Sequence, residues 1–202
     1  MKKIILPIIG VIIFVVLSFI YRKQKQQIID KLTGYLIIGD IDSFDKLYNA
    51  KKTKIFVNRF NLDLIVLNKY IIENNKGSIN KKFKEFDKYR LNNKQKEAVY
   101  KKAFYYYVGI EDKDNSKEYF DRIQKLNITD IDSIERIFDV YINDGNKYLE
   151  NTLEEINFLP VSKRSALESM ISRMYYNVED YTNAEKYRKL AEKHFKEQND
   201  EK

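Results

Sequence analysis

The residues of this 202-residue chain that could take part in chemistry are few. His194 is the only histidine and the chain has no cysteine, so a catalytic triad would have one histidine and no thiol. A histidine near the C-terminal end of a helix interacts favourably with the helix dipole, and we therefore expect His194 to be structural. Disulfides and thiolate metal sites are excluded by composition.

Two acidic motifs are candidates for a metal site. Residues 112–116, DKDNS, alternate oxygen-bearing side chains like the start of a calcium loop, but Lys117 and Ile123 stand where such a loop needs glycine and an acid. The motif DIDS at 40–43 and 130–133 precedes a helical segment both times, so its acids are expected to cap helices. We predict no metal, no cofactor and no catalytic residue.

Phosphate and glycoside chemistry have no motif either. The six glycines stand singly, whereas phosphate loops are glycine-rich turns that lead into a helix. Glu154 and Glu155 are adjacent and would point to different faces of a helix. Distant carboxylates can still converge in a fold, so an envelope enzyme or enzyme subunit with convergent carboxylates remains an alternative.

The elements that position these side chains are predicted to be helices. The chain is 44% hydrophobic and 33% charged, with only 6 Gly and 2 Pro, which favours long helices over strands and turns. Apolar residues recur at helical spacing, as in Phe56, Phe60, Leu64, Leu67 and Ile71. We predict an all-α fold.

The N-terminal segment is predicted to be a membrane anchor, residues 1–25. Residues 4–20 are apolar apart from Ser18 and would span about 25 Å as a helix. Tyr21 and Arg22 follow as an interfacial aromatic and a cationic anchor. A cleaved signal peptide is the alternative. The short leading tail favours a single-pass protein whose domain lies outside the cytoplasm.

The positive charge of the chain gathers near this segment. The net charge is +7, and residues 1–30 hold five basic residues against Asp30, which leaves +3 for the rest. A domain with so small an excess does not point to nucleic acid as a partner.

Short polar breaks divide the rest of the chain at 39–42, 74–78, 111–115, 143–146 and 177–180. Each offers Asp, Asn or Ser to cap the next helix. After each break we expect a helix with two buried positions four residues apart: Phe44 and Tyr48, Ile79 and Phe83, Ser116 and Phe120, Leu149 and Leu153, Ala184 and Arg188. The first members are 35, 37, 33 and 35 residues apart, which indicates a repeat.

The last unit carries the pattern most fully, with Tyr175 before the turn, EDY at 179–181 across it, and then Ala184 and Ala191. A helix, turn and helix with this period resembles the tetratricopeptide repeat. Ser172 stands where that family has glycine, and the chain has no tryptophan. The resemblance implies an antiparallel helical-hairpin array, an α-solenoid, over residues 26–197, followed by a polar tail at 198–202. A non-repetitive helical bundle is the alternative.

In that family the first helix of each unit lines a concave groove. The resemblance places six residues there as candidates for binding a peptide or protein partner: Lys101, Tyr105, Phe138, Tyr141, Arg173 and Tyr176. Tyrosine suits such a groove because it offers a large area with a polar tip. A role in the core is the alternative for each of them.

These features predict a non-enzymatic, membrane-tethered scaffold. The abundance of Lys, Asn, Ile and Tyr is typical of an AT-rich bacterial genome, so we expect a membrane-associated partner in an envelope or secretion complex. A regulator that senses a peptide on the cytoplasmic side is a further alternative. The sequence leaves the oligomeric state open.

Overall fold

The computed structural model describes the backbone of residues 2–200 and the side chains of residues 14–198. Within this part of the chain it contains eleven α-helices, one short 3-10 helix and no strand, which confirms the predicted all-α class. The helices divide into two compact units, Met1–Tyr89 and Arg90–Lys202. This boundary falls inside the range 26–197 that the sequence led us to expect as one repeat domain.

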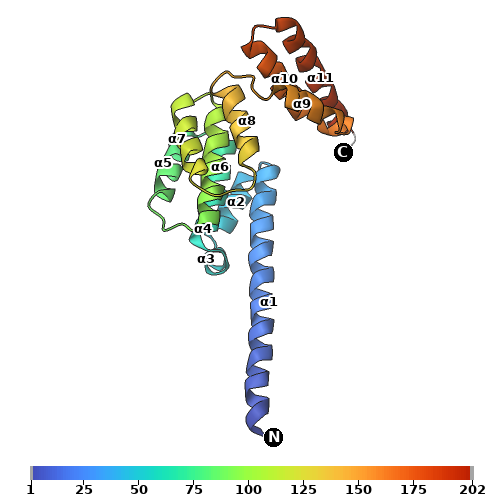
Figure 1. Ribbon diagram of the computed structural model, residues 1–202. Coiled ribbons are helices and arrows are strands. Elements are labelled where there is room, and N and C mark those ends of the chain that lie inside the picture. Colours follow the sequence, from blue (N-terminus) through green and yellow to red (C-terminus); the bar gives the residue numbers. More distant parts are fainter. Residues whose placement is uncertain (1, 201–202) are drawn as a thin grey trace. The chain divides into compact units, whose positions relative to one another are not determined.

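The first unit is built on one long helix. Its elements are α1 Lys2–Ile37, α2 Ile41–Asn49, α3 Lys51–Phe56, α4 Arg59–Ile72 and α5 Lys76–Phe86. The C-terminal part of α1 packs against α2, α3 and α4, and α4 pairs with α5 (Figure 1). The core contains aliphatic residues around a fully buried phenylalanine: Ile28, Leu32, Leu36, Phe44, Val57, Leu62, Ile65 and Val66.

The N-terminal half of α1 extends away from the other helices of its unit (Figure 1). Its apolar side chains from Phe14 to Tyr21 are all exposed, by 45% to 71%. In the described part of the chain, no helix combines the length and apolar character that a membrane span requires. Residues 4–13 of the expected anchor lie outside the described side chains. Helix α1 runs unbroken through residue 25, where we expected the anchor to end.

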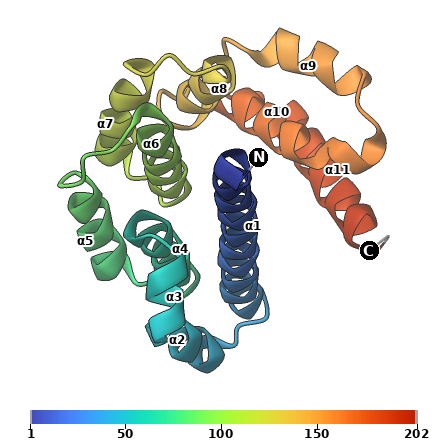
Figure 2. The same cartoon turned by 90° about the horizontal axis from the view of Figure 1, so that it is seen from below.

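The second unit contains two helical hairpins and two further helices. Its elements are α6 Asn93–Gly109, α7 Lys113–Gln124, α8 Ile131–Tyr141, α9 Leu149–Asn157, the 3-10 helix Val161–Lys163, α10 Ser165–Asn177 and α11 Tyr181–Asp200. Helix α6 pairs with α7 and α10 with α11, and α10 also packs on α8 and α9 (Figure 2). One of its cores is formed by Val140, Ile156, Ile171 and Met174, with several tyrosines around them.

Four of the five predicted breaks form the same turn. Each has a residue in the left-handed region, with φ between 51° and 73°, followed at once by a helix-capping Asp or Asn. The four pairs are Gly39 and Asp40, Asn74 and Asn75, Glu111 and Asp112, and Glu179 and Asp180. In each turn the capping side chain accepts a hydrogen bond of 3.0–3.1 Å from the backbone N–H three residues later. The predicted caps are thereby confirmed at these four positions.

A tyrosine precedes each of these turns at the same distance. The backbone N–H of the capping residue donates to the carbonyl oxygen of Tyr35, Tyr70, Tyr107 or Tyr175, five residues earlier. Such a bond, with a left-handed residue inside it, satisfies carbonyls at the end of a helix that would otherwise lack a partner. The turn therefore recurs after 35, 37 and 68 residues, the last interval being two periods.

The fifth break, at 143–146, has a different structure. Helix α8 ends at Tyr141 itself, whereas α1, α4, α6 and α10 each continue for two residues beyond their tyrosine. No side chain caps α9. The loop is held from α10 instead, because Nδ2 of Asn177 donates to the carbonyl oxygens of Val140 and Gly145 at 2.9 Å and 2.8 Å. A Cβ at Gly145 would lie 2.5 Å from the Asp139 carboxylate, which would have to move to make room for it.

Four of the ten expected buried positions are wrong, because Tyr48, Leu149 and Leu153 are half-buried and Arg188 is exposed. In α9 the fully buried residues are Thr152 and Ile156, while Leu149 and Leu153 are half-buried. Helix α9 begins directly after an irregular loop and packs on α10, so a different stripe of its surface faces the core. In α11, Arg188 is exposed and pairs with Glu185 at 2.7 Å.

Candidate partner-binding surface

The six candidate residues all lie in the second unit, two on each of three helices. Lys101 and Tyr105 are on α6, Phe138 and Tyr141 on α8, and Arg173 and Tyr176 on α10. Burial raises the pKa of Tyr105, and the charge of Lys101 has a smaller effect that lowers it. Burial likewise raises the pKa of Tyr141 against a smaller lowering effect of Arg173, which also lies over the ring of Tyr176. Phe138 belongs to neither group.

Lys101 ties α6 to the start of α8. Its Nζ lies 2.6 Å from a carboxylate oxygen of Glu97 and 2.6 Å from one of Asp130. Burial lowers the pKa of Lys101, but the hydrogen bonds to the two carboxylates outweigh it and raise the pKa overall. The bond from Lys101 holds the pKa of Asp130 below its ordinary value. Asp130 thus forms an ion pair with Lys101. It does not cap the following helix as the sequence predicted, since its side chain makes no capping bond.

Tyr105 offers a large accessible face on α6. Its side chain is 44% exposed and rests edge-on against the buried ring of Phe104, with ring centroids 5.5 Å apart. Its hydroxyl makes no hydrogen bond to any described residue. The ring is therefore fixed from behind while its hydroxyl stays available to a partner.

Phe138 packs against a neighbouring helix. Its ring stacks on that of Phe120 in α7, with centroids 3.9 Å apart and planes 5° from parallel. The ring centroids of Phe120 and Phe104 are 6.2 Å apart. Phe138 is half-buried, so its main contact is the packing of α8 on α7.

Asp144 fixes the position of Arg173 through an ion pair. Nη2 of Arg173 lies 3.0 Å from one carboxylate oxygen of Asp144, and Nζ of Lys113 lies 2.7 Å from the other. The Lys113 bond, with a smaller contribution from Arg173, holds the pKa of Asp144 below its usual range. Asp144 was not among the predicted site residues, and its only sequence signal is its place in the polar break NDGN.

Tyr141 and Tyr176 flank this arginine. The guanidinium carbon of Arg173 lies 5.7 Å from the centre of the Tyr176 ring, a cation–π distance. Tyr176 is 54% exposed, whereas Tyr141 is half-buried. Burial raises the pKa of Tyr141, and the positive charge of Arg173 partly offsets this rise. Nε of Arg173 is buried without a hydrogen-bond partner among the described residues. This cluster therefore presents an exposed aromatic face beside a cation.

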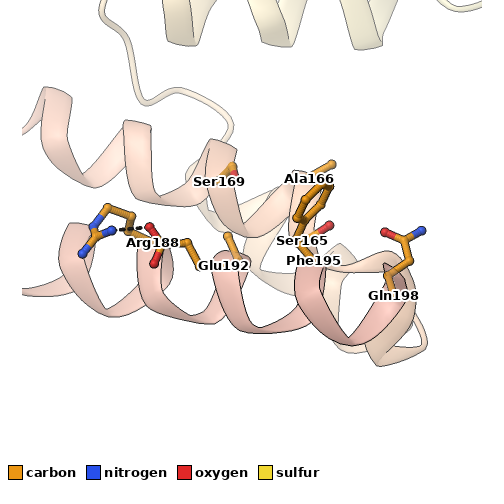
Figure 3. Close-up of a pocket in the computed structure, with 8 residues that line it drawn as sticks. Ser165, Ala166, Ser169, Arg188, Glu192, Phe195 and Gln198 are labelled. Atoms are coloured by element: carbon orange, nitrogen blue, oxygen red, sulfur yellow. Dashed lines mark hydrogen bonds and ion pairs between the residues drawn. The ribbon is translucent and has the colours of Figure 1, made fainter. Parts of the chain in front are cut away.

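A shallow hollow of about 580 Å³ lies between α10 and α11. Figure 3 shows its lining, which combines small side chains, one aromatic ring and an ion pair: Ser165, Ala166, Ser169, Arg188, Ala191, Glu192, Phe195 and Gln198. Arg188 pairs with Glu192 at one end of it. Of these residues, Arg188 and Ala191 were singled out by the repeat pattern.

His194 lies close to this hollow and is paired with a buried acid. Its Nδ1 is 2.8 Å from both carboxylate oxygens of Glu168, and the two side chains join α10 to α11. The other ring nitrogen makes no hydrogen bond to a described residue. The predicted structural role fits this position between two packed helices. Glu168 was missed because a glutamate in a helix gives no sequence sign of burial.

The first unit has a smaller hollow of about 450 Å³, which is lined by Tyr48, Lys54, Val57, Arg59, Leu62, Asp63 and Lys82. Asp63 is buried there and accepts hydrogen bonds from Lys82, at 3.1 Å, and from the Tyr89 hydroxyl. Because both bonds are made within the unit, Asp63 acts as a tie between α4 and the end of α5.

The acidic motifs resolve into caps and ion pairs. Asp40 and Asp112 each cap the following helix, and Asp112 also accepts a bond from the Asn115 amide side chain at 2.7 Å. Among the described residues, no group of three or more histidine or acidic side chains is placed to hold a metal ion.

Comparison with protein-family models, with curated proteins and with solved structures found no match to this chain.

Proposed function

We propose that this chain is a membrane-tethered, non-enzymatic scaffold that binds a peptide or protein partner through α6, α8 and α10. In this proposal the helices after α1 form a tetratricopeptide-like solenoid, with one irregular unit at α8 and α9. The partner is itself membrane-associated, in a bacterial envelope or secretion complex. Tethering would raise the local concentration of the binding surface beside that partner.

The observation that carries the proposal is the pairing of accessible tyrosines with fixed cations on these helices. Tyr105 and Tyr176 are about half exposed, and both are backed by other aromatic rings. Lys101 and Arg173 lie beside them in ion pairs that fix their positions. Aromatic residues and arginine, held rigidly and open to solvent, are the groups that contribute most to binding at protein interfaces.

The recurring turn supports the solenoid part of the proposal. Four turns with the same backbone conformation, the same capping bond and the same preceding tyrosine return at one or two periods. Repeats of this kind bury a continuous core only by stacking on their neighbours. The exposed apolar run from Phe14 to Tyr21 supports the tether, because such a run on every face of a helix requires an apolar environment.

The domain is proposed to lie outside the cytoplasm. The alternative of a cytoplasmic peptide-sensing regulator is favoured by one observation. Lys51, Lys52 and Lys54 of α3 lie beside the part of α1 that already carries Arg22 and Lys23. Basic residues gather on the cytoplasmic side of membrane segments. Protease treatment of intact cells separates the two: degradation of the domain supports the external form, and protection supports the regulator.

The binding surface is tested by crosslinking and affinity capture from native membranes. Wild type is compared with a Tyr105→Ala, Tyr176→Ala variant and with Phe158→Ala, which removes an equally large ring that is 87% exposed just after the end of α9. We expect the double variant to lose the partner and the control to keep it, with helicity unchanged by circular dichroism. Retention of the partner by the double variant would refute the proposed surface.

A further inference from the structure

Helix α3 lies against α1 at the residue where the apolar part of α1 ends. The hydroxyl of Tyr21 donates to the carbonyl oxygen of Ile55 at 3.5 Å, and the rings of Tyr21 and Phe56 are 5.4 Å apart. Thr53 turns inward, where its hydroxyl donates to the carbonyl oxygen of Leu47 at 2.6 Å. In Figure 1, α3 is the element of its unit that lies furthest toward the N-terminal half of α1. These contacts fix the height of α3 along α1.

The outward side of this junction is basic and has an apolar centre. Ile55 is 68% exposed, and Lys51, Lys52 and Lys54, which precede it on α3, are exposed as well. The basic residues at this height are Arg22, Lys23, Lys25, Lys51, Lys52 and Lys54, and none has a carboxylate within ion-pair distance among the described residues. We call these six residues and Ile55 the basic collar.

The local sequence contains no acid that could neutralise the basic collar. Residues 14–29 and 46–62 have no Asp or Glu at all. The asymmetry extends to the units, since residues 1–89 hold 17 basic and 8 acidic residues, a net charge of +9, whereas residues 90–202 hold 20 and 22, a net charge of −2. Isolated, unpaired lysines around an exposed isoleucine fit a surface that is both anionic and partly apolar.

We propose that the basic collar binds the anionic headgroups of the bilayer that α1 enters, with Ile55 reaching the boundary between headgroups and acyl chains. This inference rests on the proposed tether and names the lipid that the chain contacts. Five residues of helix rise about 7.5 Å, so Tyr21 and Lys25 stay within the headgroup layer when the apolar run ends at its edge. A basic segment beside a membrane anchor is attracted to anionic lipid over about one Debye length.

The test uses single-tryptophan variants, because the chain has no tryptophan of its own. The full chain is reconstituted into phosphatidylcholine vesicles with and without phosphatidylglycerol, and with lipids brominated near the headgroup. Ile55→Trp reports on the basic collar, and Phe14→Trp reports on the tether. Ile72→Trp, at the exposed end of α4, is the control for a remote site.

We expect quenching of the Ile55→Trp fluorescence to increase at least twofold when phosphatidylglycerol is present and to fall back in high salt. Adding Lys51→Gln, Lys52→Gln and Lys54→Gln should abolish this increase. The same charge change on α5, Lys76→Gln, Lys81→Gln and Lys84→Gln, should leave it intact. Ile72→Trp should stay unquenched throughout.

Two results would overturn the inference while leaving the tether in place. One is quenching of Phe14→Trp without quenching of Ile55→Trp, and the other is equal quenching of Ile55→Trp in neutral and anionic vesicles. If Phe14→Trp is also unquenched, the tether itself fails and the inference fails with it. An effect of the α5 substitutions as large as that of the α3 substitutions would show general charge attraction and would also refute a specific basic collar.

Discussion

Two alanines of the last hairpin determine how closely its helices approach. Ala184 and Ala191 are buried seven residues apart on α11. The hydroxyl of Ser172 in α10 donates to the carbonyl oxygen of Ala184 at 2.7 Å, so the two backbones lie near each other at this point. A side chain larger than alanine at 184 would occupy space that α10 already fills.

Replacement of Ala184 by leucine should therefore destabilise the chain. Overpacking a closely packed contact costs about 1–3 kcal/mol of unfolding free energy. Ala166→Leu is the matched control, because Ala166 is exposed on α10 and should change stability by less than about 0.5 kcal/mol. Urea unfolding followed by circular dichroism measures both, and equal stability of the two variants would contradict the close approach.

Tyr107 should make the fold sensitive to alkali. Burial, together with the nearby Asp112, raises the pKa of Tyr107 to about 12. A group whose pKa is raised in the folded state contributes stability that is complete below its unfolded pKa of about 10 and is lost as the pH rises through the folded value. The melting temperature of Tyr107→Phe should thus fall by less than that of wild type between about pH 10 and about pH 12. Parallel decline of the two proteins would contradict this assignment.

At the scale of elements, the hairpin turns can be tested through the residues that shape them. Glu179 has φ of 63°, a conformation that costs about 1–2 kcal/mol for a residue with a Cβ. Glu179→Gly removes this cost from the folded state but also makes the unfolded chain more flexible, which favours unfolding. The net effect should be a stabilisation of about 0.5 kcal/mol. Glu192→Gly, inside α11, is the control and should destabilise it by about 1 kcal/mol. If both glycines destabilise the chain alike, the turn does not have this geometry.

The cap of the same turn gives a separate prediction. The Asp180 carboxylate accepts bonds from the backbone N–H of Asn183 at 3.0 Å and from its side-chain amide at 2.7 Å. Asp180→Ala should cost about 1 kcal/mol, and Asp180→Asn much less, because asparagine is also a good capping residue. Thermal unfolding of the two variants measures this difference, and similar losses would argue against capping.

The sequence predicted these turns well because their signals are local. A polar break, a capping acid or amide and a preceding aromatic residue all lie within six positions of one another. The loop at 142–148 could not be predicted, since it depends on bonds from Asn177, more than thirty residues later. For the same reason, the burial of Thr152 and the pairing of Asp144 with Lys113 and Arg173 gave no local signal.

For the candidate surface, too, the sequence could not show which residues another helix covers. The family resemblance selected Tyr105 and Tyr176, whose side chains are 44% and 54% exposed, as groove candidates. It could not distinguish them from Phe138, whose ring is covered by Phe120 of the neighbouring helix. Helical spacing says which residues share a face, whereas cover by another helix depends on tertiary packing.

At the scale of the whole molecule, the two units differ in charge and in the roles proposed for them. The first unit carries the basic collar and the apolar half of α1, and the second carries the candidate partner-binding surface. The first unit has a net charge of +9 and the second a net charge of −2. The uneven charge is what the proposed division of roles would require.

The most direct measurement is site-specific photocrosslinking in native membranes. A photoreactive phenylalanine analogue is placed at Tyr105, at Tyr176 or at Phe158, and adducts are compared after illumination. The proposed scaffold predicts the same partner adduct from positions 105 and 176 and none from 158, because only the first two lie on α6 and α10. Adducts from position 158 with none from 105 and 176 would contradict the account.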